Sequence, residues 1–360
     1  MTEARLKELR NSIKETDREI VRLLNRRAAI SIEIGRIKAE LGMEFYDPSQ
    51  ENRIYENIMT ANGSDIPPKS LRAVFREIIS ASRALQSPVT VAYLGPEASF
   101  THLAAQSHFG TSSQFLSQPS IFDVFAEVEK EKVKWGVVPA ENSLEGSVNL
   151  TLDRLISTPL KIRAEIFVRI SHNLLTRHER LEDIETVYSH SQALAQCLTW
   201  LRANLSRAAI VEMRSTAAAA QRVVAEGKGA AIGSKSAASL YGLNILAEGV
   251  EDNASNTTRF LVMGKGEGRP SGNDKTSLLF ATPHTPGSLY SALQPFAERR
   301  INMMKIESYP VKDRPWEYLF FVDVAGHEKD EEIGRCLSEL ERKTTFFKIL
   351  GSYPCSGDTQ

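Results

Sequence analysis

The chain has 360 residues, of which 25% are charged and 42% hydrophobic, and its net charge is −1 at pH 7. This length is too great for one hydrophobic core and predicts two or three domains. A nearly neutral chain has no electrostatic footprint for a polyanion, so we expect neither nucleic acid nor a membrane surface as a partner. Three scattered cysteines and a charged N-terminal segment predict a reduced, cytoplasmic protein.

Residues 1–86 carry a helical pattern. Apolar residues recur at alternating spacings of three and four from Leu6 to Leu41, which predicts one continuous helix with a single apolar seam. Such a helix is about 58 Å long at about 1.5 Å per residue, too long to bury its seam within so short a segment. We therefore expect a homodimer or a higher homo-oligomer.

Two cations lie on this seam. Arg27 occupies a seam position, and Lys38 points within about 20° of it at about 100° per residue. Both side chains could extend to water. The alternative is a cavity inside a helical bundle that binds an anion, because buried cations need partners. Further polar candidates stand on the next two predicted helices: Asp47, Glu51, Ser82 and Gln86.

The rest of the chain has two further patterns. Residues 87–265 alternate short Val/Ile-rich runs with helical segments, which predicts an α/β region with a mainly parallel sheet in two small lobes. The Gly-rich segment MGKGEGRPSGND is expected to be a linker. Residues 275–353 give the order βαββαβ of a ferredoxin-like fold, which is a frequent ligand-sensing module.

Short polar side chains fill the predicted strand-to-helix turns of the α/β region. Any one of them could be an ordinary helix N-cap. In an open α/β sheet, however, these turns gather at the carboxyl ends of the strands, where ligands bind. Helix N-termini suit carboxylates or phosphates, so the predicted ligand is a small anion. The five turns are GPEASFT (95–101), AENSLEGS (140–147), SHSQ (189–192), RSTA (214–217) and GSKS (233–236).

The usual signatures of catalytic metals and cofactors do not occur in the sequence. The seven histidines show no metal-ligand spacing, and neither a Cys/His pair set near one another nor a GxSxG motif is present. The Gly-rich segments match neither a phosphate loop nor a dinucleotide fingerprint. We expect neither a metal nor a cofactor.

Several motifs resemble known families, and together they cover nearly the whole chain. The first 86 residues, with Arg10, Arg27 and Lys38, are similar to the all-helical (AroQ-type) chorismate mutases. The motifs GPEASFTHLA, PAENSLEGSV, SHSQALAQC and NTTRF resemble prephenate dehydratase. The motifs GSL and ESYP resemble an ACT regulatory domain. Their order resembles that of the bifunctional enzymes of phenylalanine biosynthesis, the P-proteins.

The resemblance implies three domains. Residues 1–87 would form a helical mutase dimer module, and residues 88–268 a two-lobed dehydratase like the periplasmic binding proteins. Residues 275–356 would form the ferredoxin-like ACT domain. The implied activities are an isomerase that converts chorismate to prephenate and a lyase that converts prephenate to phenylpyruvate, with feedback inhibition by phenylalanine.

The mutase resemblance implies a role for each polar residue of the helical segment. Arg10 (from the partner chain), Arg27 and Lys38 would hold the carboxylates and the ether oxygen, and Gln86 would lie near that oxygen. Asp47 and Glu51 would bind the ring hydroxyl, and Ser82 would contact substrate. A [3,3] rearrangement needs a compact conformer and stabilisation of charge on the ether oxygen, which fixed cations provide. The family often has Arg where this chain has Gln50, so we expect lower mutase activity.

The dehydratase and ACT resemblances imply further residues. Thr258 would donate a hydrogen bond to the departing hydroxyl of prephenate, and Arg259 would anchor a carboxylate or brace the loop. The small polar string from Asn253 to Thr258 would then be the rim of a cleft. Tyr309 replaces an Arg of the ACT family, which leaves the affinity and choice of effector open. The other implied substrate contacts are Ser99, Thr101, Asn142, Ser189 and Gln196, and the implied phenylalanine contacts are Gly287, Ser288, Leu289, Glu307 and Ser308.

Two other hypotheses fit parts of the sequence. A two-lobed cleft that closes on a small anion also describes a non-catalytic receptor or sensor, although a receptor does not need the charged helical seam. A dehydratase whose helical segment serves only for dimerisation is the second alternative, with Gln50 marking an inactive mutase.

Overall fold

The computed structural model describes residues 2–43, 45–46, 48–63, 65–310 and 318–356, which fall into two compact parts. The helical part contains the described residues of 1–47, 54–89 and 108–114. The second part contains residues 48–53, 90–107 and the described residues from 115 onward. None of the described helices combines the length and the apolar content needed to cross a membrane.

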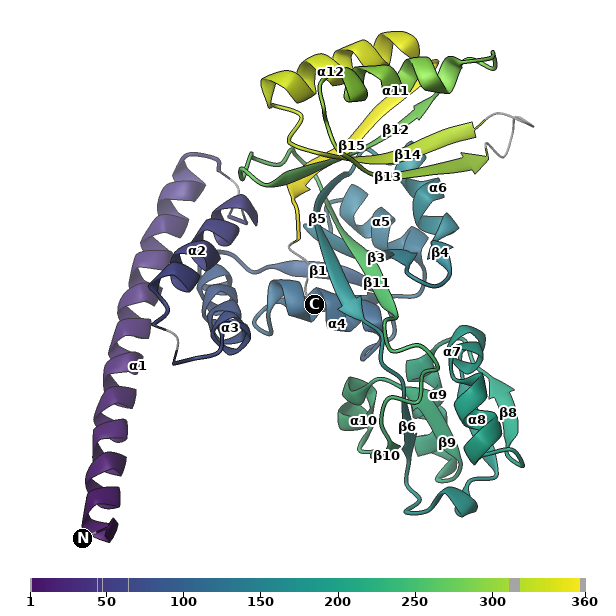
Figure 1. The fold of residues 1–360 in the computed structure, drawn as a ribbon. Coiled ribbons are helices and arrows are strands. Elements are labelled where there is room, and N and C mark those ends of the chain that lie inside the picture. Colours follow the sequence, from purple (N-terminus) through teal and green to yellow (C-terminus); the bar gives the residue numbers. More distant parts are fainter. Residues whose placement is uncertain (1, 44, 47, 64, 311–317, 357–360) are drawn as a thin grey trace. The chain divides into compact units, whose positions relative to one another are not determined.

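Three helices open the chain: α1 (Thr2–Glu40), α2 (Pro48–Ala61) and α3 (Pro68–Gln86). Helix α1 is continuous over 39 residues, which confirms the single long helix expected from the seam (Figure 1). It packs against α3, and Gly35 lets the two helices approach closely. A Cβ atom at Gly35 would lie 3.0 Å from Cβ of Gln86.

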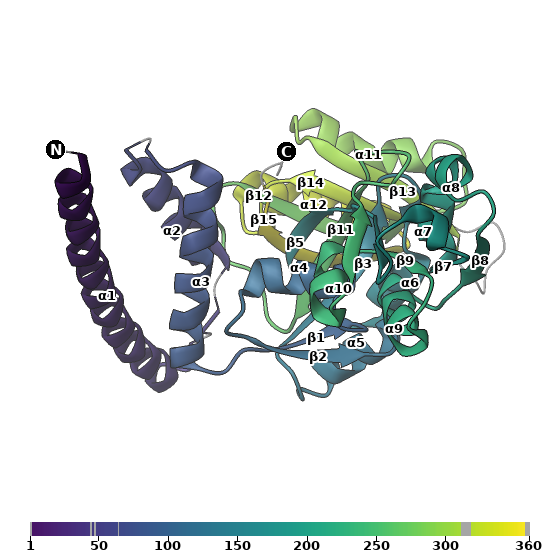
Figure 2. The same ribbon diagram turned by 90° about the horizontal axis from the view of Figure 1, so that it is seen from below.

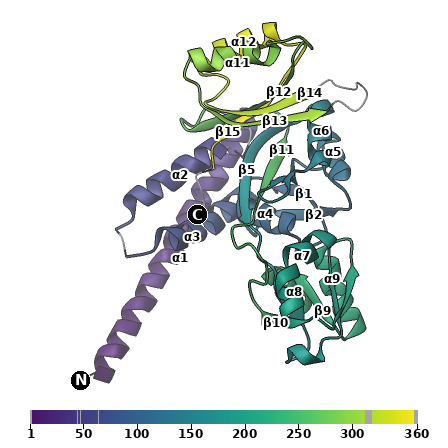
Figure 3. The same cartoon turned by 45° about the vertical axis from the view of Figure 1, so that its right-hand side comes forward.

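Within one chain the apolar seam of α1 is exposed to water. Its large side chains are between 44% and 61% accessible, and that of Leu41, directly after the helix, is 67% accessible, although seam residues of a packed helix are normally buried. Figures 1 and 3 show the N-terminal half of α1 extending beyond α3. A surface of this kind fits a helix that pairs with a second copy. The exposed seam residues are Leu6, Leu9, Ile13, Ile20, Leu23, Ile30, Ile34, Ile37 and Leu41.

The first lobe of the α/β region is a sheet with strand order β2-β1-β3-β11-β5, and β4 pairs with β3. Figure 2 shows β3, β11 and β5 as neighbours. Its strands are β1 (Thr90–Leu94), β2 (Gln114–Gln118), β3 (Trp135–Asn142), β4 (Gly146–Ser147), β5 (Lys161–Arg169) and β11 (Thr257–Gly264). Its helices are α4 (Phe100–Phe109), α5 (Ile121–Glu129) and α6 (Asn149–Ser157).

The second lobe is a sheet with strand order β10-β6-β9-β7-β8. Its strands are β6 (Asn173–Thr176), β7 (Thr186–Ser189), β8 (Ala209–Glu212), β9 (Ala230–Gly233) and β10 (Asn244–Ala247). Its helices are α7 (Ser191–Gln196), α8 (Leu198–Asn204), α9 (Thr216–Glu226) and α10 (Lys235–Tyr241), with a 3₁₀ turn at Leu181–Asp183. Two lobes were expected, and two lobes are found.

The expectation of mainly parallel sheets is wrong, because both sheets are mixed. Strands β1 and β3 are parallel, as are β7, β8 and β9, and these pairs follow the predicted alternation with helices. Strand β11 is antiparallel to both β3 and β5. The reason is that β11 re-enters the first lobe from the second, so it starts where β3 and β5 end.

Two chain segments connect the lobes and are bonded to each other. The backbone N–H of Ile170 donates to the carbonyl of Asn256 at 2.8 Å, and Val250 N–H donates to the carbonyl of His172 at 2.9 Å. The backbone N–H of His172 also donates to the carboxylate of Glu251 at 2.8 Å. This paired crossing fixes where the lobes meet.

The C-terminal domain confirms the predicted βαββαβ order and forms an antiparallel sheet, β13-β14-β12-β15. Helices α11 and α12 pack on one face, against side chains such as Phe280 and Val322. The other face packs on the first lobe through a shared apolar core (Figure 3). Of the predicted strand WEYLFFVDV, Trp316 and Glu317 lie outside the described residues. The elements are β12 (Asp274–Ala281), α11 (Ser288–Glu298), β13 (Met303–Pro310), β14 (Tyr318–Ala325), α12 (Glu331–Lys343) and β15 (Phe346–Pro354).

The contact between β15 and β5 depends on Gly351, where a Cβ atom would lie 2.2 Å from the carbonyl oxygen of Ile162. We expect Gly351→Ala to force these strands apart and to lower the free energy of unfolding by about 1–3 kcal/mol, as overpacking does. Thermal unfolding measures the change. Gly63→Ala is the control, because a Cβ atom there meets nothing within 4 Å. Equal melting temperatures for the two variants would contradict the prediction.

Candidate functional site

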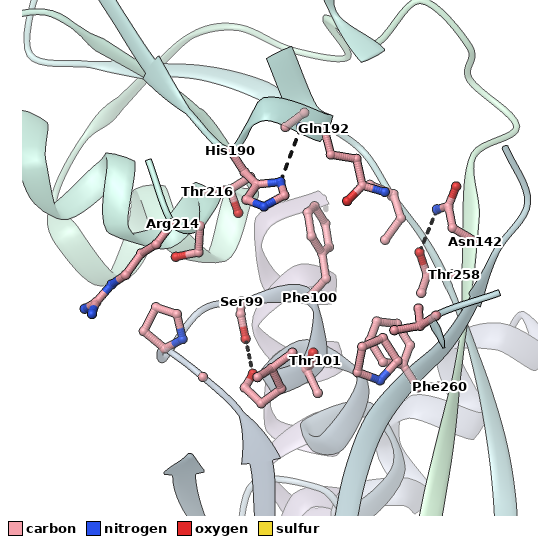
Figure 4. A pocket seen from close by; sticks show the side chains of 18 of the residues that line it. Ser99, Phe100, Thr101, Asn142, His190, Gln192, Arg214, Thr216, Thr258 and Phe260 are labelled. Atoms are coloured by element: carbon pink, nitrogen blue, oxygen red, sulfur yellow. Dashed lines mark hydrogen bonds between the residues drawn. The ribbon is translucent and has the colours of Figure 1, made fainter. Parts of the chain in front are cut away.

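A cavity of about 690 Å³ lies between the two lobes of the α/β region. Four of the five turns singled out in the sequence line it: 95–101, 140–147, 189–192 and 214–217. Figure 4 shows side chains from both lobes around it, with the ring of Phe100 between them. The fifth turn does not line it, because the Ser234 hydroxyl donates to the carbonyl of Ala98 at 3.1 Å and caps α10.

A buried amide fixes the first-lobe wall of this cavity. The Asn142 side-chain N–H₂ group donates to Thr258 Oγ1 at 2.9 Å and to Asn256 Oδ1 at 2.7 Å. The oxygen of the same amide accepts from the backbone N–H of Leu144 at 3.0 Å. With both donor hydrogens engaged, the amide of Asn142 has one orientation.

This orientation determines what the Thr258 hydroxyl can do. A hydroxyl has one hydrogen to donate and two lone pairs that accept. Because Asn142 donates to Thr258 Oγ1, the hydroxyl's own hydrogen is left for a group in the cavity, which Thr258 lines (Figure 4). Thr258 is only 8% exposed, so bulk water competes little for this hydrogen. The arrangement is a positioned hydrogen-bond donor.

Gln196 joins the crossing segments to the second lobe. Its Oε1 accepts from the Asn256 amide at 2.9 Å and lies 3.1 Å from Nε2 of His172. Its amide nitrogen donates to Glu145 at 2.9 Å. Because Oε1 has only lone pairs, His172 carries its proton on Nε2 in this arrangement. Burial lowers the pKa of His172, although the bond to Gln196 and the charge of Glu251 oppose the shift, and its ring is neutral in the cavity wall.

The polar string and two lining residues differ from the sequence analysis. Asn256 belongs to the small polar string but is completely buried and does not line the cavity, so this part of the string is a bonded wall beneath the cleft and not its rim. His190 and Arg214 belong to the turns SHSQ and RSTA, which were noticed for their hydroxyls only. In Figure 4 the guanidinium of Arg214 points away from the other labelled side chains. The sequence signal that could have identified Arg214 is a cation in the turn before a helix whose N-terminus faces a predicted anion site.

The sequence-predicted contacts of this region separate into two groups. Ser99, Thr101, Asn142, Gln196 and Thr258 all line the cavity. The hydroxyl of Ser99 also donates to the carbonyl of Leu94 at 3.0 Å and accepts from His102 N–H, so it begins helix α4. Ser189 and Arg259 do not line the cavity.

Ser189 and Arg259 point into the protein. The Ser189 hydroxyl is fully buried and donates to the carbonyl of Ile232 at 2.8 Å, which ties two strands of the second lobe together. The guanidinium of Arg259 lies 2.9 Å from Glu165 and 2.7 Å from Asp323, and it donates to the Tyr353 hydroxyl at 2.8 Å. Of the two roles expected for Arg259, bracing fits this placement and contact with a cavity ligand does not.

In the helical part, the structure brings Arg27, Ser82 and Gln86 to the contact between α1 and α3. Arg27 is half-buried, donates to the Ser82 hydroxyl, and burial lowers the pKa of its guanidinium. Lys38 is half-buried and donates to the carbonyl of Phe45 at 3.0 Å. Among the described residues, Oε1 of Gln86 is buried without a hydrogen-bond partner. A polar atom in that position is available to a ligand.

The remaining predicted residues of the helical segment are placed as follows. Arg10 is exposed on α1, and Glu51 is half-buried in the first turn of α2. Asp47 lies outside the described residues. Gln50, the departure from the mutase pattern, is exposed beside Glu51.

In the C-terminal domain Ser308 lies on the same sheet face as the GSL motif, whereas Glu307 lies on the other face. Gly287, Ser288 and Leu289 line a cavity of about 620 Å³ with Tyr318 and Phe320. Ser308 is exposed and pairs across the sheet with Phe320, whereas Glu307 points to the other face. There Glu307 lies 3.0 Å from Lys305 and accepts from Ser147 of the first lobe.

Tyr309 is also directed at the first lobe. It is 7% exposed, its ring belongs to the shared apolar core, and its hydroxyl donates to Asp153 of α6 at 2.5 Å. Burial and the contact with Asp153 raise the pKa of Tyr309 to about 12. At this position the chain carries an anchor between two domains.

Comparison with known proteins places these features in context. Sequence models of three families match in order: chorismate mutase type II over residues 9–87, prephenate dehydratase over 91–268 and the ACT domain over 276–342. A bifunctional chorismate mutase/prephenate dehydratase of Aquifex aeolicus (strain VF5) is 45% identical over 353 residues, which cover 97% of this chain and 98% of that protein. The protein of the same name from Neisseria gonorrhoeae is 44% identical over 349 residues, 96% of each chain.

A solved structure is also similar. The prephenate dehydratase of Arthrobacter aurescens in complex with L-Phe has a TM-score of 0.69 and 33% sequence identity, and the match covers 76% of this chain and 91% of that one.

The titration of His172 tests the burial of the cavity wall. Because its pKa lies below the ordinary value of 6.5, we expect its ring to take up a proton at a lower pH in the folded protein than in the urea-unfolded chain. The folded state then binds fewer protons than the unfolded state, so stability decreases as the pH falls below 6.5. NMR of labelled histidines, assigned with His172→Gln, measures both titrations; equal midpoints would refute the prediction.

Proposed function

Because the chain belongs to the family of bifunctional chorismate mutase/prephenate dehydratases, we propose that prephenate is made in the helical part and consumed in the cavity between the two lobes. The protein is an enzyme with both activities, and an ACT domain follows the dehydratase region in its sequence. We propose domain boundaries of 1–87, 88–268 and 275–356 and a cytoplasmic location. The observation that carries the dehydratase proposal is the hydrogen bond from Asn142 to Thr258 on the cavity wall.

The dehydratase reaction needs a donor at the departing hydroxyl. In prephenate the bond to the ring carboxylate breaks, its electrons enter the ring, and the carbon–oxygen bond of the hydroxyl breaks as the ring becomes aromatic. The products are phenylpyruvate, CO₂ and, once the hydroxide has taken a proton, water. A donor aimed at the hydroxyl stabilises the negative charge that develops there. Thr258 is a poor acid, so its role is that of a positioned donor, oriented by Asn142.

The carboxylates of prephenate require positive potential elsewhere in the cavity. Helices α4 and α9 begin at the cavity, with Ser99 preceding the first and Ser215 capping the second. Their first backbone N–H groups and the helix dipoles favour carboxylates. We assign the carboxylates to these two helix ends, with Thr101 and Gln196 as neighbouring contacts.

For the mutase reaction we assign Arg27, Lys38 and Gln86 to the carboxylates and the ether oxygen. Arg27 and Gln86 lie on the facing helices α1 and α3, and the buried amide of Gln86 can turn to present its N–H₂ group to the ether oxygen. Ser82 holds Arg27 in place. Asp47 and Glu51 are assigned to the ring hydroxyl, and Arg10 to the pocket of a partner chain, by analogy with the family.

Phenylalanine is the proposed effector. The ACT domain and the similarity to a prephenate dehydratase solved with L-Phe support this proposal. Gly287, Ser288 and Leu289 line the candidate cavity, and Ser308 lies exposed on the same sheet face. Glu307 contacts effector only if it leaves its present partners, Lys305 and Ser147.

Turnover of chorismate tests both assignments. We expect the purified protein to convert chorismate to phenylpyruvate. Thr258→Ala should stop at prephenate, with dehydratase kcat lowered by about a hundredfold or more, whereas Thr258→Ser keeps the donor and most activity. Arg27→Ala should lower mutase kcat by a similar factor and leave added prephenate as a good substrate.

The controls are neighbouring residues that do not line the sites. Thr257→Ala removes a hydroxyl that bonds to the backbone of Ser255, and Arg26→Ala removes an exposed cation next to the seam. Both should behave like the unaltered protein. Unconverted chorismate would indicate an inactive mutase, tight binding without turnover would indicate a receptor, and an active Thr258→Ala variant would refute the assignment of the donor.

The proposed homodimer is tested on the exposed seam. Leu23→Asp places a charge on the seam of α1, so we expect a monomer by analytical ultracentrifugation and loss of mutase activity together, because Arg10 of the partner is then absent. Arg18→Asp is the matched control, since it changes charge on the same helix away from the seam. A Leu23→Asp variant that stays dimeric would exclude the seam as the interface.

A further inference from the structure

We propose that Arg259 and Glu141 are positioning residues through which the ACT domain sets the geometry of Thr258 and Asn142. The proposal rests on the dehydratase function proposed above. It gives Arg259 a role that does not involve contact with substrate.

The two site residues and the two proposed positioning residues are cross-strand neighbours. On the antiparallel strands β3 and β11, Thr258 pairs with Asn142 and Arg259 pairs with Glu141. Successive side chains of a strand point to opposite faces of the sheet. The first pair therefore faces the cavity, with a hydrogen bond of 2.9 Å, and the second pair faces the ACT domain, with an ion pair of 3.8 Å.

Arg259 is held mainly by groups of the ACT domain. Of its close partners, Glu165 belongs to β5 of the first lobe, whereas Asp323 and Tyr353 belong to β14 and β15 of the ACT domain. The Arg259 side chain is 10% exposed, and those of Glu165 and Asp323 are 0% and 8% exposed. Lys275 of β12 completes the cluster, with its ammonium 2.9 Å from Glu165.

The burial of these charges makes the contact sensitive to displacement. Burial alone would raise the pKa of Asp323, but Arg259, Ser277 and Lys275 together bring that pKa below its ordinary value. A buried ion that loses its partner is strongly destabilised. When β14 shifts relative to β11, either Arg259 follows Asp323 or this buried ion pair is broken. If Arg259 follows Asp323, strand β11 must move. Thr258 directly precedes Arg259 on that strand, so its position changes as well.

A second link runs from the strand that carries the effector motif. Lys305 of β13 lies 2.7 Å from Glu141 and 3.0 Å from Glu307 of the ESYP motif. Lys305 also donates to the Ser147 hydroxyl at 3.2 Å. A rearrangement of β13 is therefore transmitted to the end of β3, where Asn142 follows Glu141. Both strands of the catalytic wall are thus tied to the ACT sheet by charged groups on their outer face.

Two isosteric variants of the full-length protein test this link. Asp323→Asn removes the charge opposite Arg259 without touching the cavity, and Glu141→Gln does the same at the more exposed end. We expect dehydratase kcat to fall by about threefold to thirtyfold in each, which is the range for residues that couple two sites. KM should change by less than about twofold, because the carboxylate contacts are intact. The concentration of phenylalanine that gives half inhibition should shift as well.

The matched control is another polar contact between the same two domains. Lys348 of β15 donates to the carbonyls of Leu155, Ile156 and Thr158 at the end of α6, away from β3 and β11. Lys348→Met should lower the melting temperature but keep dehydratase kcat and the response to phenylalanine. Mutase activity in the same samples reports intact folding of the helical part.

Each outcome decides between the alternatives. The proposal is wrong if Asp323→Asn and Glu141→Gln keep both kcat and the phenylalanine response, or if Lys348→Met changes them to the same extent. If Asp323→Asn does not fold, Glu141→Gln alone decides by the same criteria. Failure of the proposed function is seen separately, because the unaltered protein would then not convert prephenate.

Discussion

The pairing of β3 with β11 is the contact on which the dehydratase region depends. One face of this antiparallel pair carries the Asn142–Thr258 hydrogen bond, and the other carries Glu141 and Arg259. The pairing exists only because the chain leaves the first lobe, builds the second and returns. The proposed substrate contact and the attachment of the ACT domain thereby share one pair of strands.

The hydrogen bonds of the Asn142 amide and the ion pairs around Arg259 have different physical roles. The Asn142 amide has both hydrogens engaged, so it fixes the neutral Thr258 hydroxyl without placing a charge beside it. The ionic cluster around Arg259 lies on the far face, where buried ions impose a strict geometry because each one needs its partner. This separation keeps the buried charges on the opposite sheet face from the Thr258 hydroxyl, while the ionic cluster still connects the ACT sheet to the strands that carry Thr258 and Asn142.

In the helical part the informative feature is the exposure of apolar side chains to water. A helix of 39 residues with a long, mostly apolar seam cannot bury that seam within one chain, and the structure leaves it in water. Arg27 and Lys38 are partly withdrawn from solvent, and their partners Ser82 and the Phe45 carbonyl are neutral. Cations with neutral partners are free to take an anionic ligand, whereas the cations of the ACT interface already have carboxylate partners.

The sequence by itself determined the features that depend on local pattern: the long first helix, two α/β lobes and the βαββαβ order. The turn motifs predicted a ligand site at the strand ends, and the family resemblance implied Ser99, Thr101, Asn142, Gln196 and Thr258, which all line the cavity. Only the tertiary structure decided the mixed sheets, the burial of the Ser189 hydroxyl within the second lobe and the burial of Arg259 against the ACT domain. The partners of Arg259 lie 64 and 94 positions away, at Asp323 and Tyr353. Period-2 alternation predicts that Thr258 and Arg259 face opposite ways, but only the packing of the ACT sheet shows which face binds a ligand and which is buried against a domain.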